Sequence, residues 1–413
     1  MGCVLRVPSV KHASLPTPSD FAVPPSPAVL AGWLDADRQA RPTRLAALRE
    51  RMAREGIDAL MLTSHADARY FAGICFGPNE EPTSGSSGWL VITADALALL
   101  VDSRYIIQAQ REAPDAERID YGSDVGAAIA TWLHSHGARQ LGLDAQEVRH
   151  AVWERITEAA PGVELRSIRG WGRALRAVKE ASEIERIAAA CAVADRALAG
   201  ILDQIRPGVT ESALAWSLER AMREGGAEAL AFDVAALAGG NAALPHGNPG
   251  TRELRAGEVI LFDFGAQVAG YRSDMTRTLF VDEPSVEHAA LYTAVHRGQA
   301  ATIDLLRSAI EQGGPLPSGR ACDVATRAAM AGSAHVYDHG LGHGIGLQTH
   351  ESPSLSRGAT DDALPSPTVF SVEPGIYVQD EIGIRIEDLV AVNTAAKSLT
   401  ILTRFPAEPL IVG

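Results

Sequence analysis

Apolar residues follow two different periods in the first part of the chain. From Pro42 to Gly56 they recur at helical spacing, and the continuous apolar run at 59–62 that follows is typical of a buried strand. Further runs with these patterns predict strands at 89–92, 97–101 and 141–143 and a helix at 127–133. This alternation of helices and strands predicts an α/β domain.

The pattern changes near residues 176–182, where we place a domain boundary. Ser182 and Glu185 predict a capping box in front of a long apolar stripe, and Thr210 predicts the cap of a second helix. The strand-like runs that follow form two pairs, at 259–264 and 271–280 and at 369–372 and 384–392. Between the two pairs, helices are predicted at 286–312 and near Val324. Two helices therefore precede strands twice, which suggests two halves related by pseudo-symmetry around a curved sheet.

Length and composition predict a soluble protein of two domains. A chain of 413 residues exceeds the usual limit of one hydrophobic core. Its formal net charge of -14 at pH 7 argues against a nucleic-acid or anionic membrane surface, and it has no apolar run of about 18 residues that could span a membrane. The four cysteines lie far apart without a paired spacing, which predicts reduced thiols and a cytoplasmic location.

We divide the chain into three segments. Residues 1–40 are expected to be a flexible extension, because the stretch up to Pro27 is rich in proline and serine. Residues 41–177 and 178–413 are expected to form the two domains. Between Gly77 and Gly88 lies a long polar loop without a core-forming pattern, which we interpret as a surface loop, with a lid over a site as the alternative.

The stretch from His339 to Glu351 places three histidines among glycines. The glycines at 340, 342, 344 and 346 would each weaken a helix by about 1 kcal/mol relative to alanine, so we predict a strand and a tight turn. Glycine in such a segment lets the backbone approach a ligand closely. Three imidazoles in so short a stretch favour a functional site over a plain Gly-rich loop.

Four carboxylates stand in or beside the predicted strands of the second domain, namely Asp263, Asp274, Glu373 and Glu387. A carboxylate among core residues is costly unless something cationic compensates it. Together with His343 these acids form an oxygen-rich set with one nitrogen, which suits two divalent ions such as manganese, cobalt or zinc. Two such ions balance four negative charges and can activate water and polarise a carbonyl, which indicates hydrolysis.

Six short motifs in the second domain carry a resemblance to a known family. They are Leu-Pro-His-Gly-Asn-Pro at 244–249, Phe-Asp-Phe-Gly at 262–265, Ser-Asp-Met-Thr-Arg-Thr at 273–278, His-Gly-Leu-Gly-His-Gly-Ile-Gly at 339–346, Val-Glu-Pro-Gly-Ile-Tyr at 372–377 and Gly-Ile-Arg-Ile-Glu-Asp at 383–388. In these motifs the chain resembles the pita-bread metallopeptidases, which include Xaa-Pro dipeptidases (prolidases), Xaa-Pro aminopeptidases, methionine aminopeptidases and the metal-free creatinases.

The first domain resembles the creatinase-like N-terminal domain through Asp-Ala-Arg-Tyr at 67–70 and Asp-Ser-Arg-Tyr at 102–105. The resemblance implies a creatinase-like N-terminal α/β domain followed by a pseudo-symmetric pita-bread catalytic domain of α+β type.

The resemblance also implies a role for each acid of the cluster. Asp263 would bind one metal ion, His343 and Glu373 the other, and Asp274 and Glu387 would bridge both. Since all five ligand types are present, a metal-free creatinase is disfavoured. Two divalent ions are expected, with manganese favoured and cobalt or zinc as alternatives.

Further residues acquire roles through the same motifs. His246 and His350 would contact the substrate and its developing oxyanion, and His339 would form a wall of the proline pocket. Glu373 would also shuttle a proton, and Arg385 and Tyr377 are expected at the substrate, with Arg385 alternatively orienting an acid.

The implied activity is cleavage of the Xaa-Pro bond in dipeptides or short peptides. An Xaa-Pro bond is a tertiary amide without N–H, so a site must recognise the ring and the free amine instead. A dipeptidase is slightly favoured, and an Xaa-Pro aminopeptidase and a catalytically silent binding protein are the alternatives. A dipeptidase needs a cation for the free carboxylate, for which Arg385, Arg104 and Arg69 are candidates.

We also expect a homodimer that binds small peptides and neither nucleic acid nor membranes. We further hypothesise that the loop from Gly77 to Gly88, with its acids Glu80 and Glu81, limits the length of the substrate.

Overall fold

The computed structural model describes residues 14–77, 83–333 and 336–413, which fall into two compact units. The N-terminal unit is Pro27–Arg176, and the C-terminal unit combines the described residues before Pro27 with Ala177–Gly413. No helix among the described residues is both long enough and apolar enough to cross a membrane.

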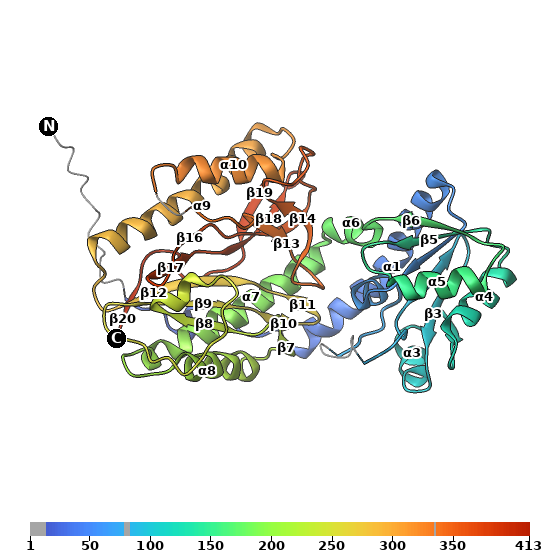
Figure 1. Cartoon of the computed structure of the whole chain (residues 1–413), viewed down its shortest axis with the longest axis horizontal. Coiled ribbons are helices and arrows are strands. Elements are labelled where there is room, and N and C mark those ends of the chain that lie inside the picture. Colours follow the sequence, from blue (N-terminus) through green and yellow to red (C-terminus); the bar gives the residue numbers. More distant parts are fainter. Residues whose placement is uncertain (1–13, 78–82, 334–335) are drawn as a thin grey trace. The chain divides into compact units, whose positions relative to one another are not determined.

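The N-terminal unit is an α/β domain built on one mixed sheet (Figure 1). Its strands are β1 (Ala59–Leu62), β2 (Leu90–Thr93), β3 (Leu97–Val101), β4 (Glu117–Asp120), β5 (Gln140–Asp144) and β6 (Glu164–Ile168). Its helices are α1 (Pro27–Glu55), α2 (His65–Asp67), α3 (Ile106–Glu112), α4 (Val125–Ser135), α5 (His150–Ala159) and α6 (Trp171–Ala177). The strand order is β4-β3-β2-β1-β5-β6, and the predicted strands at 59–62 and 97–101 are confirmed to the residue.

Strands β1, β2 and β3 are buried along their whole length. On one face, Met61 and Leu100 pack in a common core with Ile129 and Leu133 of α4. Strands covered on both faces read as continuous apolar runs, which is the pattern that the sequence shows here.

Helix α1 differs from the prediction, because it begins at Pro27 and runs through Pro42. A proline inside a helix removes one backbone hydrogen bond. Other contacts stabilise the helix around Pro42: Trp33 is buried, and Arg44 pairs with Asp37 across the proline at 3.2 Å and donates to the carbonyl of Tyr70 at 3.1 Å. The expected extension over residues 1–40 is therefore helical from Pro27 onwards.

The short segment before α1 packs on the C-terminal unit. Arg196 donates a hydrogen bond to the carbonyl of Pro18 at 2.7 Å, and the ring of Phe21 stacks on that of Phe405 with 6.2 Å between the centroids. These contacts give residues 17–21 a defined place, whereas residues 1–13 lie outside the described chain.

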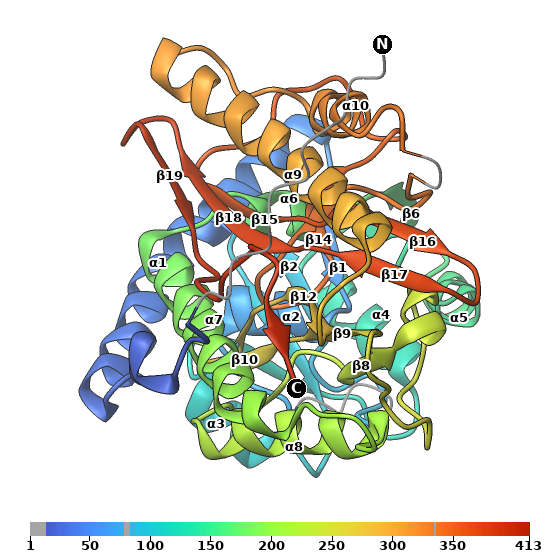
Figure 2. The same cartoon turned by 90° about the vertical axis from the view of Figure 1, so that its left-hand side faces the viewer.

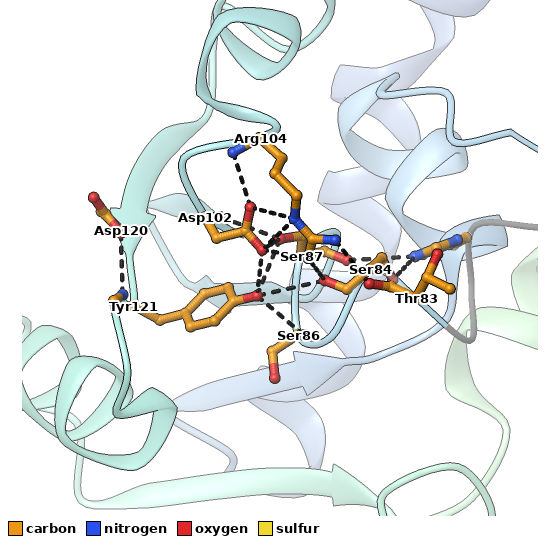
Figure 3. A network of polar contacts seen from close by, with 10 residues as sticks. Thr83, Ser84, Ser86, Ser87, Asp102, Arg104, Asp120 and Tyr121 are labelled. Carbon is orange, nitrogen blue, oxygen red and sulfur yellow. Dashed lines mark hydrogen bonds and ion pairs between the residues drawn. The ribbon is translucent and has the colours of Figure 1, made fainter.

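The described part of the loop expected at 77–88 is Gly77 and residues 83–88, and Glu80 and Glu81 lie outside it. Asp102 accepts hydrogen bonds from the hydroxyls of Ser87 at 3.2 Å and Tyr121 at 2.9 Å (Figure 3). Arg104 pairs with Asp102 and donates to the carbonyl of Thr83 at 2.9 Å. The hydrogen bond from Arg104 holds the pKa of Asp102 well below its usual range. The motif at 102–105 thus anchors this loop.

The C-terminal unit contains four long helices and the remaining strands. The helices are α7 (Ala181–Ile201), α8 (Glu211–Glu224), α9 (Val286–Gln312) and α10 (Gly319–Ala329). The strands are β7 (Ala229–Leu230), β8 (Ala235–Ala238), β9 (Val259–Phe264), β10 (Ala266–Val268), β11 (Tyr271–Arg272), β12 (Met275–Val281), β13 (Gly342–Gly344), β14 (Glu351–Leu355), β15 (Thr368–Val372), β16 (Gly375–Val378), β17 (Ile382–Arg385), β18 (Asp388–Asn393), β19 (Ser398–Ile401) and β20 (Ile411–Val412).

The order of two helices followed by strands occurs twice in this unit, as predicted. The first half forms the sheet β20-β12-β9-β8, and the second half forms the sheet β14-β13-β15-β18-β19. Helices α7 and α8 pack against β10, β11 and β8. Helices α9 and α10 pack against strands of the second half (Figures 1 and 2). The order of elements therefore agrees with the two expected halves, each with a pair of helices against its strands.

The start of α7 corrects one predicted detail. Ser182 and Glu185 do not cap the helix; Glu180 is the N-cap, and its backbone N–H donates to the side chain of Glu183 at 2.8 Å. The cap therefore lies two positions earlier than predicted, because acidic residues replace the usual hydroxyl. The predicted cap of α8 is confirmed, since the hydroxyl of Thr210 accepts from Ala213 N at 3.2 Å.

A buried arginine ties together the strands of the two halves. Arg277 on β12 is 1% exposed, pairs with Asp388 on β18 at 2.6 Å and donates to the carbonyl oxygens of Glu387 and Phe405, each at 2.6 Å. Gln299 on α9 also donates to Asp388, at 2.9 Å. A buried charge is tolerable only when its partners are complete, as they are here.

We predict that Arg277→Met lowers the free energy of unfolding by about 3 to 5 kcal/mol, because it leaves Asp388 and several carbonyls buried without this donor. The measurement is urea unfolding in the presence of a chelator, so that metal binding does not contribute. Arg307→Met is the control: Arg307 pairs with Asp304 on an exposed face of α9 at 2.7 Å, and its loss should change the stability by no more than about 0.5 kcal/mol. Equal effects of the two variants would contradict the prediction.

Candidate metal centre

The His339–Glu351 stretch has the predicted strand and turn, since β13 and the start of β14 lie within it. Strand β13 lies between β14 and β15. A side chain at Gly342 would place its Cβ 2.0 Å from the carbonyl oxygen of Ser371, and one at Gly344 would lie 2.0 Å from that of Ser352. These glycines are therefore required by the neighbouring strands, whereas the sequence suggested close approach to a ligand.

Two of the four acids lie where strands break. The runs predicted as continuous strands, 271–280 and 384–392, are each divided in the structure, with Asp274 between β11 and β12 and Glu387 between β17 and β18. Asp263 lies within β9, opposite Thr276 of β12, and Glu373 directly follows β15. Where a strand leaves its ladder it can redirect a side chain, and both breaks face one cavity.

That cavity has a volume of about 380 Å³. It is lined by Phe232, Pro245, His246, Asp263, Asp274, His339, Gly340, Gly342, His343, Thr349, His350, Glu373, Arg385 and Glu387. Among the ligands and substrate contacts expected from the motifs, Tyr377 is not in this lining, but it contacts His339 and Arg385, which are. Arg69 and Arg104, the other candidates for the substrate carboxylate, are not lining residues either. Sequence reasoning missed Phe232 and Thr349. Phe232 lies in an irregular segment between β7 and β8 that carries no pattern.

Side chains of the predicted ligand set converge in the cavity. Asp274, His343 and Glu387 each offer one ligand atom, and these atoms all lie within 4.8 Å of one another. The Nε2 atom of His343 is 3.6 Å from Asp274 Oδ2 and 3.5 Å from Glu373 Oε1. Its Nδ1 atom faces the carbonyl of Gly344 at 3.1 Å, and because a carbonyl only accepts, Nδ1 carries the hydrogen and Nε2 presents its lone pair.

The acids are held by donors outside the cluster. Thr276 donates to Glu387 Oε2 at 2.7 Å, and Ser371 donates to Glu373 Oε1 at 3.1 Å. Arg385 donates to Asp263 Oδ2, while the other oxygen of Asp263 is buried and has no hydrogen-bond partner among the described residues. Such second contacts fix the orientation of ligand side chains and are typical of metal sites.

The electrostatics of the cluster require positive charge. Burial, together with the neighbouring carboxylates, raises the pKa of Asp274 and of Glu387 well above the ordinary values. Burial raises the pKa of Glu373 to about 7, against the charge of Arg385, and burial lowers the pKa of His343. A neutral imidazole and an unpartnered carboxylate oxygen beside further carboxylates form a donor set that fits divalent metal ions.

Arg385 connects Asp263 to His339 through a chain of hydrogen bonds. Its Nη1 donates to the hydroxyl of Tyr377 at 3.1 Å, and its Nε donates to Thr276 at 2.9 Å. The Tyr377 hydroxyl lies 3.0 Å from His339 Nε2, and His339 Nδ1 lies 2.7 Å from the carbonyl of Gly340. Nδ1 must donate to this carbonyl, so Nε2 accepts the Tyr377 hydrogen and the ring is neutral; burial lowers the pKa of His339 to about 4.

The remaining two histidines also line the cavity. The ring of His350 lies 4.2 Å from that of His343 between centroids, and burial, followed by the charge of His343, lowers the pKa of His350. His246 is exposed, on the segment between β8 and β9. The structure thus brings His246, His339 and His350, which are expected to contact the substrate, to one cavity. The three side-chain nitrogens of Arg385, in contrast, donate to protein groups.

Comparison with known proteins agrees with the fold. The model of "Metallopeptidase family M24" matches residues 185–394, and that of "Creatinase/Prolidase N-terminal domain" matches residues 44–178. An uncharacterized peptidase of Bacillus subtilis, YqhT, is 32% identical over 372 residues, which cover 89% of this chain and all of the relative. The chain belongs to metallopeptidase family M24.

Two solved structures resemble the whole architecture. An Xaa-Pro dipeptidase from Bacillus anthracis aligns with a TM-score of 0.80 at 30% identity, over 90% of this chain and 100% of its own. An X-Pro aminopeptidase from Thermotoga maritima aligns with a TM-score of 0.77 at 31% identity, over 89% and 99%. The expected combination of a creatinase-like domain and an M24 catalytic domain is thereby confirmed.

We predict that Asp274→Asn and Glu387→Gln each lower the metal content to less than about half of the wild-type value, because a neutral amide is a poor ligand for two cations. The metal content is measured by elemental analysis after dialysis against manganese. Asp304→Asn, which changes an exposed acid of α9, should leave it unchanged. Full metal content in Asp274→Asn or Glu387→Gln would remove these residues from the ligand set.

Proposed function

We propose that this protein is a dinuclear-metal hydrolase that cleaves the Xaa-Pro bond of dipeptides or short peptides. The observation that carries the proposal is the convergence of four carboxylates and His343 on one cavity. The similar structures support the substrate class, since one is an Xaa-Pro dipeptidase and the other an X-Pro aminopeptidase.

In this proposal, Asp263 would hold one ion and His343 and Glu373 the other, and Asp274 and Glu387 would be ligands to both. The ions are manganese in the favoured case, with cobalt or zinc as alternatives. When bound, two such ions lower the pKa of water and polarise the scissile carbonyl. The protein holds the ligands in place through Thr276, Ser371 and Arg385, as described above.

The proton and the oxyanion are handled by residues of the chain. Glu373 accepts a proton from the attacking water and delivers it to the proline nitrogen, which must be protonated to leave as an amine. Ser371 donates to Glu373 Oε1, which orients the carboxyl group for this transfer. His350 and His246 line the cavity on both flanks of the acids and donate to the oxyanion or the substrate backbone.

The proline ring is placed between His339 and the apolar lining residues Phe232 and Pro245. Neutral His339 offers a ring face without charge, and the Tyr377 hydroxyl fixes its orientation. An apolar wall suits a cyclic side chain whose nitrogen offers no donor.

A second candidate, an Xaa-Pro aminopeptidase that accepts longer peptides, is favoured by the contacts of Arg385. Among the described residues that line the cavity, Arg385 is the sole arginine or lysine. Three of its five N–H groups donate to Asp263, Thr276 and Tyr377, which reduces its capacity to bind the free carboxylate of a dipeptide. The other candidates from the sequence, Arg69 and Arg104, belong to the N-terminal unit, where Arg104 pairs with Asp102.

We predict that the metal-loaded enzyme cleaves Ala-Pro, Gly-Pro or Ala-Pro-Ala and is inactivated by a chelator, with activity restored by manganese. Comparing kcat/KM for Ala-Pro with Ala-Pro-Ala and with the amide of Ala-Pro separates the two candidates. A dipeptidase should lose at least about tenfold when the carboxylate is removed. Absence of turnover on every Xaa-Pro substrate in protein with two bound metals would refute the proposed function.

We predict that His350→Ala keeps its metal and fold but loses about 100-fold or more in kcat, because its contact forms in the transition state. His343→Ala should lose metal as well as activity. The metal content and kcat of the two variants are compared in the same preparation. Equal metal retention in the two variants would show that their roles are wrongly assigned.

A further inference from the structure

His350 is the last residue of a short irregular turn. The hydrogen bonds and the ion pair around this turn have no role in the reaction proposed above. Residues 346–350 join β13 to β14, and His350 projects into the cavity beside His343. The turn lies outside the named strands, so the side chains that flank it contribute to the position of His350.

The side chain of Glu351 holds the turn that precedes it. It is the first residue of β14 and pairs with Gly344 of β13. Its Oε1 accepts the N–H of Gln348 at 3.1 Å, and the N–H of Gly346 donates to the carbonyl of Gln348 at 3.1 Å. The carboxylate that follows His350 therefore sets the path of the backbone that precedes it.

Lys179 supplies the positive charge for this buried carboxylate. Its Nζ lies 3.5 Å from Glu351 Oε2, and the two side chains are 1% and 0% exposed. The backbone N–H of Lys179 donates to the carbonyl of Pro367 at 2.8 Å, immediately before β15. The ammonium group is thus anchored in a fixed position rather than on a mobile surface chain.

Gly346 leaves the space that this ion pair occupies. A Cβ at position 346 would lie 2.9 Å from Glu351 Oε2 and 3.3 Å from Lys179 Cε. Any larger residue would push against the pair. The lack of a side chain at Gly346 therefore leaves room for the ion pair.

The opposite flank of the turn is fastened by Arg272. Its Nη1 donates to the hydroxyl of Thr349 at 3.1 Å and to the carbonyl of Ala231 at 3.0 Å, and its backbone N–H donates to the carbonyl of Gly346 at 2.9 Å. Thr349 itself donates to the carbonyl of Ala231 at 3.2 Å. Fixed on both flanks, the turn has little freedom to move His350 away from the acids.

We propose that Lys179 is a positioning residue, which acts through its buried ion pair with Glu351 to hold the turn that presents His350 to the substrate. The proposal rests on the proposed function for the role of His350. Removing one partner of a buried pair weakens the compensation of the charge that remains, whereas removing both is often close to neutral. This difference separates the action of the pair from the packing of either side chain.

The first experiment is a mutant cycle on the manganese-loaded enzyme, with the Xaa-Pro substrate that the wild type cleaves best. Lys179→Met and Glu351→Gln should each lower kcat by about tenfold or more while KM stays within about threefold and metal content is unchanged. The double variant should recover to within about threefold of the wild type. Lys397→Met, which changes an exposed lysine in the turn between β18 and β19, is the matched control and should leave kcat unchanged.

The Lys179→Met substitution in the His350→Ala background tests whether Lys179 acts on kcat through His350. If Lys179 acts through His350, adding Lys179→Met to His350→Ala changes kcat by less than about twofold, because the position of the missing imidazole no longer matters. A full loss from Lys179→Met in that background, or no recovery in the double variant with Glu351→Gln, would overturn the proposal.

Hydrogen exchange gives a readout that does not depend on activity. In metal-loaded protein without substrate, amides of residues 346–350 should exchange about tenfold faster or more in Lys179→Met than in the wild type, with β18 and β19 unchanged. Unchanged exchange in the turn would overturn the positioning role. If the wild type cleaves no Xaa-Pro substrate, the proposed function fails, and the exchange data alone still decide whether the ion pair holds the turn.

Discussion

The burial of several carboxylates in one cavity is the constraint on which the rest of the C-terminal unit depends. Asp274 and Glu387 are each less than 5% exposed, and their mutual repulsion and desolvation would hold protons on them unless cations are present. Three of the acids are fixed by a donor, namely Glu387 by Thr276, Glu373 by Ser371 and Asp263 by Arg385. The binding of positive charge would therefore stabilise the ionised form of this cluster.

A second layer of polar contacts supports the first. Arg277 binds the carbonyl of Glu387 and the carboxylate of Asp388, and Gln299 brings α9 into the same network. This layer joins a strand of the first half to a strand of the second half. Because Asp274 comes from the first half and Glu387 from the second, the geometry of the metal centre depends on how closely the halves are locked together.

Arginine has different tasks in different parts of this molecule. Arg385 orients Asp263 and donates to the Tyr377 hydroxyl beside His339, while Arg272 helps to hold the turn that carries His350. A planar guanidinium with several donors can serve three acceptors at once, and each donor that is engaged in this way is lost to the substrate. In the proposed function, the choice between a dipeptide and a longer peptide therefore depends in part on the internal hydrogen bonds of Arg385.

The sequence by itself determined the features that depend on neighbours along the chain. Strands β1, β3 and β9 and helix α9 have the predicted bounds, because their periods and turn residues are local properties. The six motifs also identified the acids and histidines of the cavity, since their residue types carry the chemistry. Tertiary structure decided what depends on residues far apart in sequence. It broke the predicted strands at Asp274 and Glu387, extended α1 through Pro42, committed Arg385 to Asp263 and brought Lys179 to Glu351. The physical reason is that a buried charge is satisfied by whichever partner the fold brings to it, and no local pattern records that partner.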